Sequence, residues 1–196
     1  MLLENKNAVI YGGGGAVGGA VARAFAREGA RVFLVGRTLA TLDTVAQDIT
    51  AAGGMAETAQ VDALDGQAIE KHLDDLVNKA GNVDISFNLI GLGGAQGAPL
   101  VNMTAEDFRL PINNAMTTQF LTATAAGRHM AKQKSGVILA LTANAARKPY
   151  EAAGGFGVAG AAIEGLCRQL AAELGAAGYP RGLSALVWIA GYPWRA

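Results

Sequence analysis

The sequence predicts an α/β fold: a single Rossmann-like domain whose doubly wound parallel sheet carries helices on both faces. Two observations indicate this class. Short apolar segments alternate with amphipathic segments of helical periodicity along the 196 residues. Four consecutive glycines, 12–15, separate the first apolar segment from the first helical one. Because parallel strands need helical crossovers, we expect six strands in the order 3-2-1-4-5-6, in one domain, 1–196, that ends after the sixth strand.

Each element is predicted from its local pattern. Strands are expected where short apolar runs lie between glycine or polar residues, at 7–11, 31–35, 56–61, 85–89, 136–141 and 183–189. Helices are expected where apolar residues recur every three or four positions, at 16–28, 39–52, 66–80, 111–133 and 154–177, with a short turn near 105–108. In the first of these helices Val17, Val21 and Phe25 follow that spacing, which predicts an apolar face.

The first strand, the glycine cluster, the first helix and the second strand form one βαβ unit over residues 8–37. Glycines allow a tight turn and a close approach of the backbone to a pyrophosphate, and the N–H groups of the following helix attract the anion. We therefore expect a dinucleotide-binding turn made by Gly12, Gly14, Gly15, Val17 and Gly18. A merely flexible turn would explain the glycines but not the flanking periodicity.

The residues after the second strand predict which nicotinamide cofactor binds. An NAD site usually has Asp or Glu there, to accept hydrogen bonds from the ribose 2′-OH. Here the strand is followed by Gly36, Arg37 and Thr38, and no carboxylate occurs before Asp43. Arg37 can meet a 2′-phosphate, and Gly36 leaves room for it. We expect NADP(H) to be preferred over NAD(H); the alternative is that Arg37 is a solvated residue capping the next helix.

Composition argues against several other classes of protein. The formal net charge is zero without a basic block, which disfavours a nucleic-acid partner, and no apolar run is long enough to span a bilayer. Cys167 is the only cysteine, so we expect no disulfide and no thiolate cluster, and we place it in the core. We expect His72, His129 and Glu164 at helix surfaces and predict no metal site. The N-terminus does not look like a signal peptide, so a cytoplasmic location is expected.

Three segments match the motifs of one family. The glycine turn reads Tyr11-Gly12-Gly13-Gly14-Gly15-Ala16-Val17-Gly18 where the family has Thr-Gly-x-x-x-Gly-x-Gly. Val61-Asp62-Ala63 follows the third strand, and Asn88-Leu89-Ile90-Gly91 stands where the family has Asn-Asn-Ala-Gly. The chain resembles the short-chain dehydrogenase/reductase family over nearly its whole length. The resemblance implies a nicotinamide cofactor across this edge of the sheet, with Asp62 and Ala63 at the adenine and Asn88, Ile90 and Gly91 beside the cofactor.

The family's catalytic pattern is incomplete in this chain. Members reduce carbonyls or oxidise alcohols with a Tyr that transfers the proton, a Lys four residues later that lowers the pKa of that Tyr, a Ser and an Asn. Phe156 stands at the Tyr position and Gly160 at the Lys position. A gapless count puts the Ser position on Ala143, whereas a loop one residue longer puts it on Thr142. For the family's Asn, a gapless count gives Ala115, whereas a one-residue slip gives Asn114.

Tyr150 is a further candidate proton donor. It lies in the loop after the fifth strand, with Arg147 and Lys148 just upstream, and that loop borders the expected nicotinamide pocket. A phenol needs a nearby cation to act at neutral pH, because its ordinary pKa is about 10. The alternative is that Tyr150 packs as part of a solvated loop without a catalytic role.

Together these features predict an NADP(H)-dependent oxidoreductase with a non-standard proton donor and a small carbonyl or alcohol substrate that we do not identify. Two alternatives remain. One is an inactive cofactor-binding protein, either a sensor or a partner subunit. The other is a shortened, non-functional relative, because family members usually continue past the sixth strand through a substrate-covering lobe. The family often assembles through its two long helices, so we expect a homo-oligomer through helices 111–133 and 154–177.

Overall fold

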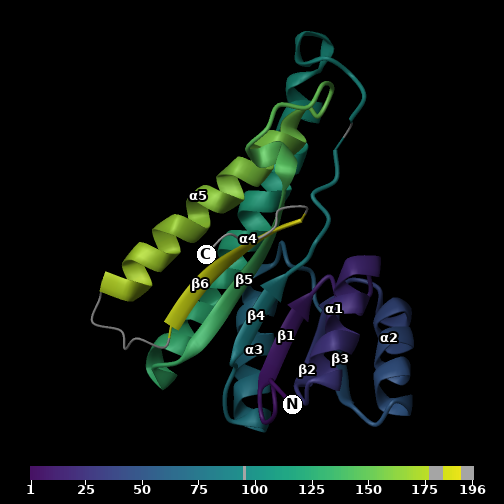
Figure 1. Cartoon of the computed structure of the whole chain (residues 1–196), viewed down its shortest axis with the longest axis vertical. Helices are drawn as coiled ribbons and strands as arrows, with labels where there is room; N and C mark the ends of the chain where they lie inside the picture. Colours follow the sequence, from purple (N-terminus) through teal and green to yellow (C-terminus); the bar gives the residue numbers. More distant parts are fainter. Residues whose placement is uncertain (95, 177–182, 191–196) are drawn as a thin grey trace.

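The computed structural model describes residues 1–94, 96–176 and 183–190, and it has the predicted α/β architecture (Figure 1). The strands are β1 Asn7–Tyr11, β2 Arg31–Gly36, β3 Met55–Gln60, β4 Ile85–Asn88, β5 Gly136–Ala143 and β6 Leu183–Ala190. The helices are α1 Ala16–Arg27, α2 Leu39–Ala51, α3 Gly66–Ala80, α4 Ala105–Gln133 and α5 Gly155–Ala176, with the single 3₁₀ turns η1 Leu100–Asn102 and η2 Asn144–Ala146. All strands pair in parallel in the order β3-β2-β1-β4-β5-β6, which confirms the predicted sheet order.

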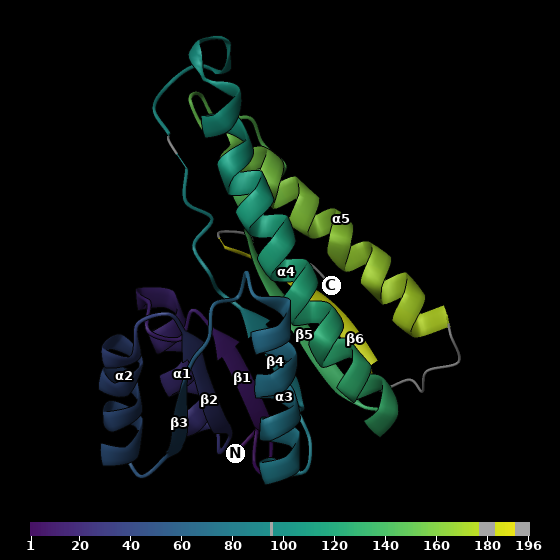
Figure 2. The same ribbon diagram turned by 180° about the vertical axis from the view of Figure 1, so that it is seen from behind.

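The two faces of the sheet bury different side chains of the same strands. In β1, Ala8 and Ile10 point to the face covered by α1 and α2, whereas Val9 and Tyr11 point to the face covered by α3 and α4. This alternation follows from the two-residue period of a strand. Figure 2 shows α3, α4 and α5 together on one face of the sheet. In the described residues, helices therefore cover both faces of the sheet around β1.

The fourth helix is longer than predicted. We expected a short turn near 105–108 and a separate helix from 111, but α4 runs unbroken from Ala105 through Pro111 to Gln133. The Thr104 side chain caps the helix by accepting a hydrogen bond from the Asp107 backbone N–H at 3.1 Å. Pro111 lacks an N–H and thus costs the helix one hydrogen bond in its second turn, but it does not end the helix. The beginning of α4 therefore extends beyond the sheet, beside the loop that precedes α5 (Figure 1).

None of the helices among the described residues has the length and hydropathy needed to cross a bilayer.

Candidate nucleotide-binding and catalytic sites

A cavity of about 540 Å³ lies where β1, β2, β3 and β4 end. The carboxyl edge of an open parallel sheet is where such folds bind ligands. Of the residues that we expected to bind the cofactor, the cavity wall includes Gly12, Gly14, Gly15, Arg37, Asp62, Ala63, Ile90 and Gly91. Loops that are far apart in the sequence thus come together around one space.

The glycine turn needs residues without side chains. Gly12 has a φ of 78°, and a Cβ there would lie 2.8 Å from the Leu89 carbonyl oxygen. A Cβ at Gly18 would collide with the carbonyl oxygen of Gly12, and one at Gly14 would collide with the Thr41 hydroxyl. Gly18 and the half-exposed Val17 do not line the cavity. The lack of a side chain at Gly18 instead allows α1 to begin close to the turn.

The N-terminus of α1 faces this turn without a side-chain cap, because its first flanking residue is Gly15. The backbone N–H groups of the first helical turn have no partners within their own helix. Such groups, with the positive end of the helix dipole, bind phosphate oxygens. The turn therefore offers the chemistry that a pyrophosphate requires.

Arg37 is exposed at the rim of the cavity, directly after β2. Its backbone carbonyl accepts a hydrogen bond from Gln60 Nε2 at 2.8 Å, which ties the loop after β2 to the end of β3. Thr38, the N-cap residue of α2, makes no side-chain capping bond. Thr38 and Thr41 also line the cavity. Neither threonine was predicted to line a site, although their positions one and four residues after Arg37 could have indicated it.

Asn88 shapes the cavity from behind rather than lining it. Its side chain is buried; Oδ1 accepts a hydrogen bond from the Ile90 N–H at 3.0 Å, and Nδ2 donates to Thr122 Oγ1 at 3.1 Å. These bonds fix the chain where it leaves β4 and place Ile90 and Gly91 in the cavity wall. Similarly, Asp62 Oδ1 accepts a hydrogen bond from the Leu64 N–H at 3.0 Å and holds the loop after β3.

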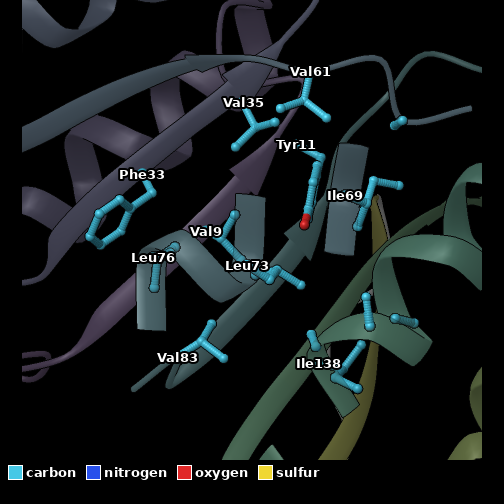
Figure 3. Packing of buried hydrophobic residues seen from close by; sticks show 14 of the residues in the cluster. Val9, Tyr11, Phe33, Val35, Val61, Ile69, Leu73, Leu76, Val83 and Ile138 are labelled. Carbon is cyan, nitrogen blue, oxygen red and sulfur yellow. The ribbon is translucent and has the colours of Figure 1, made fainter. Parts of the chain in front are cut away.

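Tyr11 stands at the threonine position of the family's glycine motif. Its side chain is fully buried between β1 and α3, against Ile69 and Leu73 (Figure 3). The hydroxyl has no hydrogen-bond partner among the described residues. Burial raises the pKa of the Tyr11 phenol above its ordinary value, so the group stays neutral.

A second cavity, of about 450 Å³, lies beyond the end of β5, between the loop that precedes α4 and the loop that precedes α5. Ala143 and Phe156, which the gapless count places at the family's Ser and Tyr positions, both line it. Tyr150 and Asn144 also line it, and Asn144 Nδ2 donates a hydrogen bond to the Tyr150 hydroxyl at 3.0 Å. Asn144 could not be predicted from the sequence, because its hydrogen bond to Tyr150 depends on the path of the loop.

The three candidate catalytic residues lie in different surroundings. Tyr150 lines the second cavity, whereas Asn114 lines the first and donates a hydrogen bond from Nδ2 to the Leu92 carbonyl at 3.1 Å. Thr142 is buried outside both cavity walls and donates from Oγ1 to the Gly160 carbonyl at 3.2 Å. A Cβ at Gly160 would lie 2.9 Å from that Thr142 oxygen. The hydroxyl of Thr142 therefore occupies the space beside the family's Lys position.

Three charged or titratable side chains are more buried than we predicted. Glu164 is buried, and both of its carboxylate oxygens accept hydrogen bonds from Arg147 Nε, at 3.0 and 3.2 Å. His129 is only 12% exposed, with Nε2 3.2 Å from Asp74 Oδ1, and His72 Nδ1 is buried without a hydrogen-bond partner in the described chain. Burial lowers the pKa of the His72 imidazole. Sequence periodicity missed these positions because the covering groups come from other elements.

Cys167 is buried, as predicted, and burial raises the pKa of its thiol to about 11. The thiol is therefore protonated and unreactive at neutral pH. Among the described residues, no group of three or more His, Cys, Asp or Glu side chains could hold a metal ion.

The geometry agrees with comparisons against known proteins. A family model described as short chain dehydrogenase matches residues 6–179. The chain is 29% identical to an uncharacterized oxidoreductase, UxuB, of Bacillus subtilis over 90% of this chain and 68% of the relative. It is 31% identical to the uncharacterized oxidoreductase MT0954 of Mycobacterium tuberculosis over 88% of this chain, and spans 65% of that relative's length.

A solved structure of a metagenomic short-chain oxidoreductase in complex with NADP has the same fold. It superimposes with a TM-score of 0.86 at 26% sequence identity, covering 98% of this chain and 85% of the other. The family model covers most of the chain, and the solved structure shares its fold. The chain therefore belongs to the short-chain dehydrogenase family.

Proposed function

We propose that this protein is an NADP(H)-dependent oxidoreductase that acts on a small carbonyl or alcohol substrate with a non-standard proton donor. The observation that carries the proposal is the first cavity, in which a side-chain-free glycine turn and Arg37 line one space. When bound, a nicotinamide cofactor supplies or accepts a hydride. The chain's own residues must bind and orient it and must move the proton.

The residues around the cavity suit such a cofactor. Gly12, Gly14 and Gly15 would admit the pyrophosphate to the N-terminus of α1, because side chains at Gly12 and Gly14 would fill or distort the cradle. Asp62 and Ala63 would bound the adenine, and Ile90 and Gly91 the part of the cofactor next to β4. These assignments rest on the position of each residue in the cavity wall together with family membership.

Arg37 supports NADP(H) as the preferred cofactor. Its side chain forms no salt bridge with any described carboxylate, so the guanidinium can bind a 2′-phosphate at the cavity rim. The free hydroxyl of Thr38 and the start of α2 lie beside it. We infer that charge-assisted hydrogen bonds from Arg37 favour NADPH over NADH.

Calorimetry with NADPH and NADH tests the cofactor assignment. Arg37→Ala should weaken NADPH binding about ten- to hundredfold, the value of one or two hydrogen bonds to a charged group, and should leave NADH binding almost unchanged. Arg27→Ala, at the exposed far end of α1, is the matched control and should alter neither affinity. Failure of the unmodified protein to bind either nucleotide would contradict the proposal.

Turnover separates the oxidoreductase from its inactive alternative. If the protein binds NADPH but does not oxidise it in the presence of any carbonyl substrate, the function is cofactor binding in a sensor or partner subunit. If it turns over, Thr142, Tyr150 and Asn114 are the side chains to replace. Tyr150 is the strongest of the three as donor, because it brings a phenol into the cavity that Phe156 lines. We also propose that copies of the chain associate through α4 and α5.

A further inference from the structure

The second cavity contains a polar pair that the family's motifs do not describe. Asn144, in the 3₁₀ turn that follows β5, donates its amide N–H to the phenol oxygen of Tyr150 at 3.0 Å. Tyr150 is 53% exposed, and both residues line the cavity wall together with Phe156. A phenol hydroxyl thus reaches this cavity from the loop, while the helix position that carries the family's tyrosine holds a phenyl ring.

The hydrogen bond leaves the phenol proton free. Asn144 is the donor and the phenol oxygen is the acceptor, so the O–H of Tyr150 is not used by this bond. No hydrogen bond from the Tyr150 hydroxyl to any described residue competes for that proton. The phenol can therefore donate into the cavity while its oxygen is held.

Asn144 adopts its position at a cost in free energy. Its amide oxygen, Oδ1, is buried and has no hydrogen-bond partner among the described residues. A buried acceptor without a partner costs more free energy than one exposed hydrogen bond to Tyr150 returns. Stability alone thus gives no reason for an asparagine here, whereas a role at the cavity does.

We propose that Asn144 is a positioning residue that holds the Tyr150 phenol in this cavity as the proton donor to the substrate oxygen. The inference rests on the proposed function and deepens it, since it selects Tyr150 among the candidate donors and names the residue that replaces the missing lysine. Asn144 takes over part of the lysine's task, because an amide N–H stabilises a phenolate that forms beside it.

In the reducing direction, a bound nicotinamide cofactor would supply a hydride to the carbonyl carbon, and the C=O π pair would move to the oxygen. That oxygen takes the proton of Tyr150; the O–H bond breaks, and its electron pair stays on the phenolate, which accepts the Asn144 N–H. Solvent then reprotonates the phenolate, because the side chain is half exposed.

The charged groups around the pair are Glu151, Arg147 and Lys148. Glu151 lines the same cavity, so its carboxylate opposes formation of a phenolate. Arg147 is paired with the buried Glu164, which offsets its charge. Lys148 lies in the same loop. Any test of Asn144 must therefore separate its effect from that of Glu151.

Titration of the Tyr150 phenol in the free protein tests the pair without any turnover. The absorbance change of tyrosinate is recorded against pH, and the signal of Tyr150→Phe is subtracted to isolate Tyr150. Asn144→Leu should raise the titration midpoint, because the donor to the phenolate is lost. Asn144→Asp should raise it further, since an acceptor with a negative charge replaces the donor. Glu151→Gln should lower it, and Asn78→Leu, on the exposed side of α3, should leave it unchanged.

The rate of turnover and its dependence on pH provide a second test of the pair formed by Asn144 and Tyr150. Tyr150→Phe should reduce turnover of a carbonyl substrate with NADPH at least a hundredfold, the usual value of general acid catalysis, and the pH profile of Asn144→Leu should shift by the same amount as its titration. If Asn144 had only a structural role, its replacement would lower the thermal stability of the protein without moving the midpoint of the Tyr150 titration or of the pH profile of turnover. Equal midpoints for Asn144→Leu and the unmodified protein would overturn the inference.

The two proposals can fail separately. Turnover that survives Tyr150→Phe overturns the role of the pair and leaves the oxidoreductase standing. NADPH binding without turnover overturns the oxidoreductase, and with it the catalytic role of Tyr150, even if the titration shows the two side chains to be coupled.

Discussion

Tyr11 is part of the hydrophobic core although it stands inside the glycine motif. It occupies the threonine position of the glycine motif, yet its ring fills the core between β1 and α3. The ring contributes buried apolar area, whereas the hydroxyl is buried without a partner among the described residues. The benefit of the residue to stability therefore lies in its ring alone.

Tyr11→Phe should accordingly stabilise the protein. Removal of an unpaired buried hydroxyl should increase the free energy of unfolding by about 1 kcal/mol, measured by denaturant titration. Tyr150→Phe, which removes an exposed hydroxyl, is the control and should change that free energy by less than about 0.5 kcal/mol. A loss of stability in Tyr11→Phe would mean that the Tyr11 hydroxyl has a partner in solution.

Residue-scale features were the hardest to predict from the sequence. The burial of Glu164 depends on Arg147, which arrives from the loop before α5, and His129 meets Asp74 across two helices. The periodicity of a helical sequence predicts the apolar face of that helix, but it does not predict which residues of other elements pack against it. By contrast, Cys167 was placed correctly, because an apolar neighbourhood within its own helix already implied burial.

At the scale of elements, the first half of α5 lies unusually close to its neighbours. A Cβ at Gly157 would lie 2.8 Å from the Ala145 carbonyl oxygen, and one at Gly155 would collide with the Phe108 carbonyl of α4. At Gly160 the obstacle is the buried Thr142 hydroxyl, at 2.9 Å. The helix can approach β5 this closely only because these positions lack side chains, and the approach removes the room for the family's lysine.

Gly160→Ala should therefore destabilise the protein although alanine favours a helix. Overpacking costs about 1–3 kcal/mol and helix propensity returns about 1 kcal/mol, so we expect a net loss of about 1 kcal/mol in the free energy of unfolding. Gly165→Ala is the matched control in the same helix: its Cβ would meet only Arg168 Nη2, at 3.8 Å, so this change should stabilise. The double change Thr142→Ala/Gly160→Ala should recover the loss, and a loss that persisted would point to another obstacle.

Strands and helices were predicted well because each has its own periodicity, and the boundaries differ only by a few residues in most cases. The exception is α4, which we divided at Pro111. Proline is favoured in the first turn of a helix and disfavoured later, so the sequence suggested a start there. The capping bond of Thr104 and the acidic residues Glu106 and Asp107 in the first turn offset the single lost hydrogen bond.

At the scale of the whole molecule, the parallel sheet determines where function can lie. The order of the six strands brings the ends of β1 to β4 to one edge, so the sequence was sufficient to predict the region of the nucleotide cavity. The sequence indicated that the loop with Tyr150 borders a pocket, but it did not indicate which side chains meet there, since the second cavity is built from two irregular loops, before α4 and before α5. Loops have no period, and their contacts depend on the finished fold.

The two long helices also carry a consequence for assembly. α4 and α5 pack side by side on one face of the sheet (Figure 2). Each presents a large apolar side chain to solvent. Phe120 of α4 is 54% exposed and Val158 of α5 is 45% exposed. About half of each side chain is already covered, so burial of the rest between two copies of the chain would be favourable by about half of the 1.5–3 kcal/mol that full burial contributes. The exposed apolar side chains of α4 and α5 therefore favour self-association of the chain through these two helices.

Light scattering after size separation tests this association. The unmodified protein should have a mass that is a multiple of one chain, and Phe120→Arg should shift it toward a single chain, because a charge cannot be buried in the interface without a partner. Gln47→Arg, an exposed position of α2 on the opposite face of the sheet, tests whether added charge alone has this effect and should leave the mass unchanged. A single-chain mass for the unmodified protein would contradict the proposed association. It would leave the nucleotide cavity unaffected, because the described residues of one chain form that cavity without a second copy.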